Sequence, residues 1–117
     1  MQAKIALDLI DCSDSEKFCF GVYCEECNTL YKSREVMFSR AGVIPGSEEK
    51  KLVLQILYEK EKTIAKQRAL KTFKEKFNVC PVCNRKVCDK CFLICEELDM
   101  CTSCAKKLKE CGERVDT

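Results

Sequence analysis

Apolar and polar residues alternate over the first ten positions of the chain, where three aliphatic residues share one phase. A period of two residues is typical of a half-buried strand, so the pattern predicts a short strand over residues 2–10. The polar residues 11–17 are expected to form a turn. An aromatic and β-branched run at 18–23 then leads into the first pair of cysteines.

Two short apolar runs flank a polar centre within residues 29–40. This arrangement predicts a β-hairpin with strands at 30–33 and 36–39 and a turn near 33–35. Residues 41–47 contain two glycines and a proline, and are therefore expected to form a connecting loop.

A long helix is predicted over residues 47–77, a segment without glycine or proline. Ser47 is a good N-cap, and Glu48 and Glu49 in the first turn complement the helix dipole. About 30 residues at 1.5 Å each give a helix roughly 45 Å long. Its apolar positions cluster at the two ends, and its centre is mostly charged.

The polar centre means that so short a chain cannot pack this helix on all sides. We expect the apolar positions of the helix to pack against the cysteine-rich part of the protein. Homo-oligomerisation through the helix is the alternative. It has weak support from Ile56, Thr63, Leu70 and Phe77, which recur at the seven-residue spacing of a helix–helix seam.

The 117-residue chain contains 12 cysteines and neither histidine nor tryptophan. Without histidine there is no Ser–His or Cys–His nucleophile pair, no imidazole general base and no imidazole metal ligand. A transition-metal site must therefore use thiolates, with carboxylates as a poor second choice. No apolar run approaches the 18 residues of a transmembrane helix, so a membrane span is not expected.

The formal net charge is +2, which does not by itself indicate a nucleic-acid-binding protein. That sum assumes neutral thiols, and eight thiolates around two Zn²⁺ ions would make the protein slightly acidic. A local excess of positive charge lies in the second half of the predicted long helix. It is either a solvated face or a surface for nucleic acid. The residues are Lys66, Arg68, Lys71, Lys74 and Lys76.

Eight of the cysteines fall in four Cys-x-x-Cys pairs, a repeated spacing that indicates metal binding. Secreted disulfide proteins rarely repeat this gap four times, and the N-terminal residues lack the features of a signal peptide. We therefore expect a cytoplasmic metal-binding protein, with disulfides or mixed redox use as less favoured interpretations. The pairs are Cys24 with Cys27, Cys80 with Cys83, Cys88 with Cys91, and Cys101 with Cys104.

Two Cys-x-x-Cys turns complete one tetrahedral shell of four sulfurs, so four pairs predict two sites of four cysteines each. Zinc is favoured over iron, because tetrahedral thiolate sites in small non-enzymatic domains are mostly zinc sites. The predicted cofactors are two Zn²⁺ ions per chain. The four remaining cysteines are Cys12, Cys19, Cys95 and Cys111. Cys19 and Cys95 lie in apolar runs, where a buried and inert thiol is the usual case.

The order of the pairs in residues 80–104 resembles the latter three-quarters of a FYVE-type zinc finger. That family has two pairs separated by four residues, then a variable strand region, then a last pair that opens a terminal helix. Val87 and Leu108 lie where the family has apolar residues. The resemblance implies a cross-brace, treble-clef scaffold in which Cys24 and Cys27 form the first pair.

Two departures limit what this resemblance implies. About 50 residues separate Cys27 from Cys80, whereas the first two pairs of the family are close in sequence. The basic, histidine-containing motif with which the family recognises lipid is also absent, and residues 75–79 stand in its place. The resemblance therefore extends to the metal scaffold and not to recognition of phosphatidylinositol 3-phosphate.

Two groupings of the cysteine pairs remain open. The sequential grouping joins the first pair to the second and the third to the fourth. The cross-brace, which is favoured, interleaves them. It assigns Cys24, Cys27, Cys88 and Cys91 to one metal, and Cys80, Cys83, Cys101 and Cys104 to the other.

Together these features predict a single small α+β zinc-binding domain over residues 1–117, with a treble-clef or zinc-knuckle core. Short antiparallel strands and the first knuckle are expected in 1–46, and a cysteine-rich finger in 78–117. A short C-terminal helix is predicted from Ala105 to near Gly112.

Four equivalent cysteine pairs leave no open coordination position, so no catalytic metal is expected. We therefore predict a non-enzymatic interaction module, an adaptor or regulator that binds a protein partner. The alternatives are nucleic-acid binding through the basic half of the long helix, and a thiol-based redox sensor.

Overall fold

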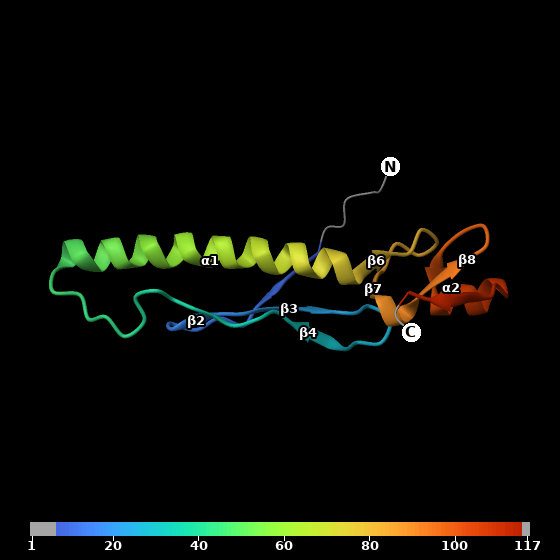
Figure 1. The fold of residues 1–117 in the computed structure, drawn as a ribbon, viewed down its shortest axis with the longest axis horizontal. Coiled ribbons are helices and arrows are strands. Elements are labelled where there is room, and N and C mark those ends of the chain that lie inside the picture. The colour runs from blue at the N-terminus through green and yellow to red at the C-terminus, as the bar shows by residue number, and fades with distance from the viewer. Residues whose placement is uncertain (1–6, 116–117) are drawn as a thin grey trace.

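Short antiparallel strands and two α-helices make up residues 7–115, the part of the chain that the computed structural model describes (Figure 1). The molecule is elongated, with extents of 65 × 26 × 19 Å. The elements in chain order are β1 (Ile10–Asp11), β2 (Lys17–Phe18), β3 (Phe20–Tyr23), β4 (Leu30–Lys32), β5 (Val36–Met37), α1 (Glu48–Lys76), β6 (Phe77–Val79), β7 (Lys86–Cys88), the 3₁₀ turn η1 (Asp89–Cys91), β8 (Phe92–Cys95), β9 (Met100–Cys101), α2 (Thr102–Leu108) and β10 (Gly112–Arg114).

A long, bent hairpin supports the helix α1. Strands β2 and β3 form one arm and β4 and β5 form the other, because β3 pairs with β4 and β2 pairs with β5. The register changes by one residue between these ladders, since residues 33–35 lie opposite residues 19–20. One extra residue on one arm is a β-bulge.

The predicted hairpin within residues 29–40 is wrong. Strands β4 and β5 do not pair with each other but follow one another along a single arm. The polar residues between them form the bulge instead of a turn. Ser33 holds it in place, because its hydroxyl oxygen accepts a hydrogen bond from Phe20 N at 2.9 Å and its own N–H donates to Phe20 O at 2.7 Å.

The N-terminal strand is shorter than predicted. Residues 1–6 lie outside the described part of the chain, and residues 7–9 form no strand. Strand β1 begins only at Ile10, where it pairs with β3 through Ile10 opposite Gly21 and Asp11 opposite Phe20. The polar turn predicted from residue 11 accordingly begins after β1.

Helix α1 forms as the sequence predicts. Ser47 is its N-cap, and the hydroxyl oxygen of Ser47 accepts a hydrogen bond from Lys50 N at 3.2 Å. Two glutamates lie in the first turn and two lysines in the last, where they complement the helix dipole. The helix ends at Lys76 because Phe77 turns into an extended conformation and pairs with Cys88 in the β6–β7 ladder.

Small residues bring α1 close to the hairpin. Ala65, Ala69 and Phe73 recur every four residues, are buried, and belong to the same core cluster as Phe18 and Phe20. Residues at this spacing lie on one face of a helix. Alanine on that face allows the helix backbone to approach β2 and β3, which α1 contacts.

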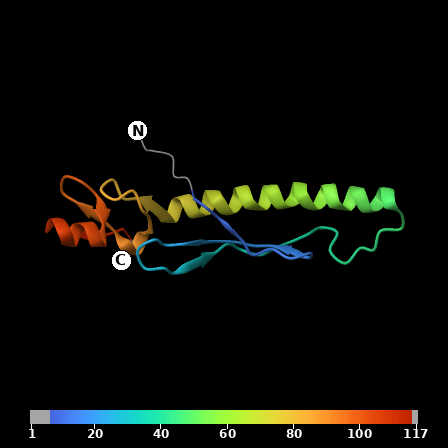
Figure 2. The same ribbon diagram turned by 180° about the vertical axis from the view of Figure 1, so that it is seen from behind.

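The N-terminal turns of α1 extend beyond the hairpin, where only the 38–47 connection runs beneath them (Figure 2). Leu52, Val53 and Ile56 are consequently 58%, 62% and 60% exposed. The seven-residue series from Ile56 to Phe77 does not form one exposed seam either, because Phe77 is buried in β6.

An aromatic cluster holds the charged centre of α1 to the hairpin. The ring of Tyr58 lies 5.1 Å from that of Phe18 and 5.3 Å from that of Phe38. The Tyr58 hydroxyl also donates a hydrogen bond to Asp14 O at 2.8 Å. One turn further along, Lys62 forms an ion pair with Asp11 at 2.6 Å, which ties α1 to β1.

The C-terminal finger begins with the β6–β7 hairpin and continues as a sheet of order β10-β8-β9 beside α2. Helix α2 starts three residues before the predicted Ala105, and it ends at Leu108 rather than near Gly112. Gly112 instead opens β10 opposite Cys95. A Cβ atom at Gly112 would lie 2.6 Å from Ile94 O, so the close approach of these strands requires glycine. Within the described residues, no helix combines the length and the apolar character that a membrane crossing requires.

We expect Ala69→Leu to destabilise the protein by about 1–3 kcal/mol, because the larger side chain overpacks the contact between helix and hairpin. Gln67→Leu, which places the same side chain on the exposed face of α1, should change stability by less than about 0.5 kcal/mol. Urea unfolding of the metal-loaded proteins measures both effects. Equal stability of the two variants would contradict the packing described here.

Candidate metal centres

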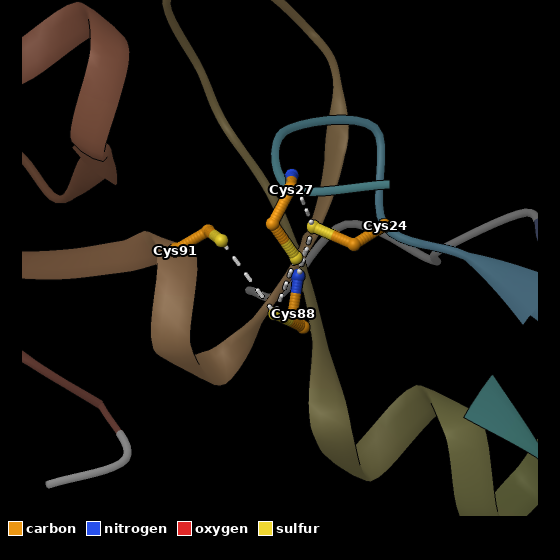
Figure 3. A group of neighbouring side chains, drawn as sticks. All are labelled: Cys24, Cys27, Cys88 and Cys91. Carbon is orange, nitrogen blue, oxygen red and sulfur yellow. Dashed lines mark hydrogen bonds between the residues drawn. The ribbon is translucent and has the colours of Figure 1, made fainter. Parts of the chain in front are cut away.

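Four cysteine sulfurs from two distant segments of the chain meet at the tip of the long hairpin (Figure 3). They belong to Cys24, Cys27, Cys88 and Cys91, and all lie within 4.8 Å of one another. The sulfurs of Cys27 and Cys88 are 3.9 Å apart, and those of Cys88 and Cys91 are 3.7 Å apart. We call this group the hairpin centre.

A second group of four sulfurs lies within the C-terminal finger. It contains Cys80, Cys83, Cys101 and Cys104, whose sulfurs also lie within 4.8 Å of one another. The sulfurs of Cys83 and Cys101 are 3.8 Å apart. We call this group the finger centre. The two groups are interleaved along the chain, because the pair at 80 and 83 lies between the two pairs of the hairpin centre.

The sulfur spacing fits a tetrahedral metal site. In a regular tetrahedron with metal–sulfur bonds of about 2.3 Å, neighbouring sulfurs are roughly 3.8 Å apart. The observed separations of 3.7–3.9 Å match this value. A disulfide would require about 2.05 Å. Each group could therefore hold one metal ion with four thiolate ligands.

Each centre takes one cysteine pair from a tight turn of the same construction. Cys24-x-x-Cys27 and Cys80-x-x-Cys83 are both followed by an asparagine with left-handed backbone, at φ 59° for Asn28 and 63° for Asn84. The asparagine N–H donates to the first cysteine carbonyl, at 2.9 Å and 2.7 Å respectively. Asparagine tolerates this conformation better than most residues. The shared Cys-x-x-Cys-Asn pattern is visible in the sequence, although none of the sequence-based predictions used it.

The other pair of each centre lies at the start of a helical turn. Cys88 immediately precedes η1, which ends at Cys91. Cys101 is the N-cap of α2, and its sulfur accepts a hydrogen bond from Cys104 N at 3.5 Å. The free N–H groups and the dipole at a helix N-terminus favour negative charge. At Cys91 and Cys104, burial and the neighbouring sulfurs outweigh this effect and raise the pKa of each thiol.

Backbone N–H groups also point at the first sulfur of each turn. Cys24 Sγ accepts hydrogen bonds from the N–H groups of Glu26, Cys27 and Cys88, at 3.4, 3.5 and 3.3 Å. Cys80 Sγ accepts one from Cys101 N at 3.3 Å. The bonds from Cys88 and Cys101 cross between the two pairs of a centre and so align them.

Arg85 links the two centres. Its Nε lies 3.4 Å from Cys83 Sγ and its Nη2 lies 3.5 Å from Cys101 Sγ, while its Nη1 donates to Glu25 O at 2.9 Å. Its guanidinium also forms an ion pair with Glu26. A fixed positive charge beside the finger centre compensates part of the negative charge that four thiolates bring. The same side chain holds the first turn of the hairpin centre.

The acidic residues of that first turn clamp it onto the finger. The Glu25 carboxylate accepts a hydrogen bond from Lys86 N, and Glu25 N donates to Lys86 O at 3.1 Å. The Glu26 carboxylate accepts from the Ser103 hydroxyl in α2 as well as from Arg85. In the sequence, Glu25 and Glu26 stand out only as an acidic patch, because their partners lie about 60 or more positions away along the chain.

One thiol of each centre ionises more readily than an ordinary cysteine. The Thr29 hydroxyl, 3.2 Å from Cys27 Sγ, lowers the pKa of Cys27 to about 6. Burial raises the pKa of Cys83, but the hydrogen bonds from Arg85 and neighbouring groups outweigh it and bring the pKa to about 6. Burial and the adjacent sulfurs raise the pKa of Cys104 to about 12 and that of Cys91 further still.

The remaining cysteines lie outside both groups. Cys19 is buried between β2 and β3, as predicted, whereas Cys95 is only half-buried in β8. Cys12 is half-buried and Cys111 is exposed.

The basic residues of α1 do not form a single stripe. Lys66 lies on the flank of the helix beside β1, with Leu9 and Asp11, whereas Arg68 and Lys76 lie on the opposite flank, beside β4 and β5. Lys71 and Lys74 are exposed.

Comparison with known proteins identifies no relative: no family model matches the chain, and neither a curated protein nor a solved structure does so.

We expect Arg85→Gln to weaken metal binding at the finger centre about 10- to 100-fold, because it removes the charge and the donors beside Cys83 and Cys101. Arg85→Lys keeps the charge and loses the planar guanidinium, so its metal affinity should lie between those of Arg85→Gln and the native protein. Arg40→Gln, at an exposed position of the 38–47 connection, is the charge-matched control. Competition with a chromophoric chelator measures the affinities, and equal effects of Arg85→Gln and Arg40→Gln would refute the role of Arg85.

Metal affinity should fall as the pH falls, because the raised pKa values of Cys91 and Cys104 mean that binding releases protons. Thiolates held by a metal titrate below their usual range, so the metal contributes its full stability at alkaline pH and loses it as the solution becomes acidic. Each released proton makes the affinity fall by up to about tenfold per pH unit. Titrations at pH 8, 7 and 6, corrected for protonation of the chelator, measure this slope. A flat profile would show that the thiols are already ionised.

Proposed function

We propose that this chain is a non-enzymatic, zinc-binding interaction module. Two structural zinc sites, each with four cysteine ligands, would fasten its C-terminal finger to the tip of its long hairpin. The observation that carries the proposal is the pair of interleaved sulfur groups with tetrahedral spacing. Zinc is the metal that such four-thiolate sites most often hold in small domains.

The ligand set supports a structural role. Four thiolates complete the zinc shell, whereas catalytic zinc normally keeps one position for water or substrate. When bound, the ion supplies a charge-compensated crosslink between segments. The chain contributes the N–H groups that point at Cys24 and Cys80 and the guanidinium of Arg85.

The construction of the finger centre also supports a treble-clef scaffold. A turn of the Cys-x-x-Cys type and a last pair that opens a terminal helix are parts that the FYVE-like resemblance implies, and the finger centre contains both. An adaptor or regulator in a reducing compartment such as the cytoplasm fits free thiols of this kind. Nucleic-acid binding and thiol redox sensing remain predictions from the sequence alone.

Native mass spectrometry of the purified chain tests the proposal directly. Two zinc ions per chain are expected, together with four thiols that bind no metal. Removal of zinc by a strong chelator should abolish cooperative unfolding, since structural zinc contributes about 10 kcal/mol or more to the folding of small domains. A metal-free chain with disulfides, or circular dichroism that does not change on chelation, would refute the proposal.

Single substitutions assign the ions to the two centres. Cys27→Ser in the hairpin centre and Cys83→Ser in the finger centre should each leave one zinc ion tightly bound. Cys111→Ser, which removes an exposed thiol outside both groups, should retain two. Loss of zinc from the Cys111 variant would contradict the assignment.

A further inference from the structure

An open groove runs between helix α1 and the second arm of the hairpin. Its volume is about 690 Å³. One wall is the chain from Tyr31 to Met37, and the other is the flank of α1 from Ala65 to Lys76. We call it the β4–α1 groove. It lies apart from the ligand sulfurs of both metal centres, so the zinc sites do not account for it.

The strand wall of the groove is an unpaired sheet edge. In the sheet of order β1-β3-β4, the strand β4 is the last, and within residues 7–115 no strand pairs with its outer side. Ser33 N points inward and bonds to Phe20 O. Because hydrogen-bonding direction alternates along a strand, the N–H and C=O groups of Lys32 point away from β3. Such an edge is a template for another extended chain.

The two flanks of α1 differ in how they are covered. On one flank, β1 pairs with β3 and its Asp11 forms the ion pair with Lys62. On the other flank, no strand of the described residues pairs with the outer side of β4, and the groove occupies the corresponding place. An extended segment beside β4 would complete the layer beneath the helix on this side.

The charge of the groove selects for acidic ligands. Four cationic side chains line it from both walls, whereas its single acidic residue, Glu35, is already paired with Lys17 at 3.0 Å. The bulge at residues 33–35 forms part of the strand wall, and bulges often adjoin binding sites. The cationic residues are Lys32, Arg34, Arg68 and Lys76.

Apolar residues line the groove beside these charges. Met37 is 60% exposed and Val36 is also exposed, and both line the groove together with the inner helix residues Ala69 and Phe73. A peptide with alternating acidic and apolar residues presents both kinds of side chain and a main chain that can pair with a strand edge. A nucleic acid supplies phosphates but no main-chain groups of that geometry.

We infer that the β4–α1 groove binds an extended acidic peptide segment of a partner protein. The segment adds as a strand to the outer edge of β4, and its carboxylates contact Arg34, Arg68 and Lys76. This inference rests on the proposed function as an interaction module and names the kind of partner that the module binds.

Fluorescence anisotropy with the zinc-loaded full chain tests the inference. The probe is a labelled seven-residue peptide of alternating Glu and Val, with a Lys–Val peptide as the charge control. A third peptide with the Glu–Val sequence carries N-methyl groups that block strand pairing. Only the first peptide should bind, and amide signals of residues 30–37 should shift in its NMR titration.

Two charge reversals on the same helix localise the binding. Arg68→Glu, inside the groove, should weaken the Glu–Val peptide at least about tenfold. Lys71→Glu, which is exposed and does not line the groove, should change affinity less than about threefold. Equal losses in both variants would overturn the inference, because they would show only general attraction between opposite charges.

Two further outcomes would also overturn it. One is binding of the N-methylated peptide as tightly as the unmodified one. The other is binding of a seven-nucleotide oligothymidine in place of the peptide. Native mass spectrometry of the same sample separates the two proposals. A chain with two zinc ions that binds no peptide refutes the groove and leaves the zinc module intact, whereas a chain without metal refutes the proposed function itself.

Discussion

Closure of the hairpin centre is the contact on which the rest of the structure depends. Cys27 and Cys88 are 61 positions apart in the sequence, and their sulfurs are 3.9 Å apart. All of α1 lies between them, so a metal ion bound by these sulfurs would fix both the hairpin tip and the C-terminal end of the helix. Closing a loop of this length costs about 4 kcal/mol in chain entropy. Structural zinc provides about 10 kcal/mol or more, which exceeds the cost of closing the loop.

The hydrophobic core alone is thin. Its largest fully buried side chains include only two phenylalanines, Phe18 and Phe77, together with Val87 and three cysteines. These three, Cys24, Cys80 and Cys101, belong to the two candidate metal centres, so the core and the ligand sulfurs form one cluster. Because little apolar packing is available there, hydrogen bonds and an ion pair of Glu25, Glu26 and Arg85 orient the ligand cysteines. If the sulfurs separate, the metal ligands and the packing of the hydrophobic core are therefore lost together.

Local signals in the sequence predicted what local physics determines. The Ser47 cap, the acidic first turn and the absence of glycine and proline were enough to predict α1 almost to the residue. The four cysteine pairs were enough to identify the eight sulfurs that come together. Partners set by tertiary contacts were not predictable. The polar residues around Ser33 have the composition of a turn but form a bulge. Whether they form a turn or a bulge depends on the hydrogen bonds with Phe20 on the other arm of the hairpin. Likewise, spacing alone left two groupings of the cysteine pairs open, and the interleaved grouping depends on how the first turn docks against Lys86.

The narrow hairpin beneath α1 explains why the helix has so little apolar surface. Two of the three residues on its buried face, Ala65 and Ala69, are small, and this face packs against a narrow hairpin and not a broad sheet. The helix can therefore remain charged on its other sides, and it is held at intervals by Tyr58, by Lys62 with Asp11, and by Phe73. A helix attached along one narrow face, with β1 on one flank only, necessarily leaves the opposite flank open. The β4–α1 groove is thus a consequence of how few strands support the helix, and the cationic residues beside it determine what kind of chain can occupy it.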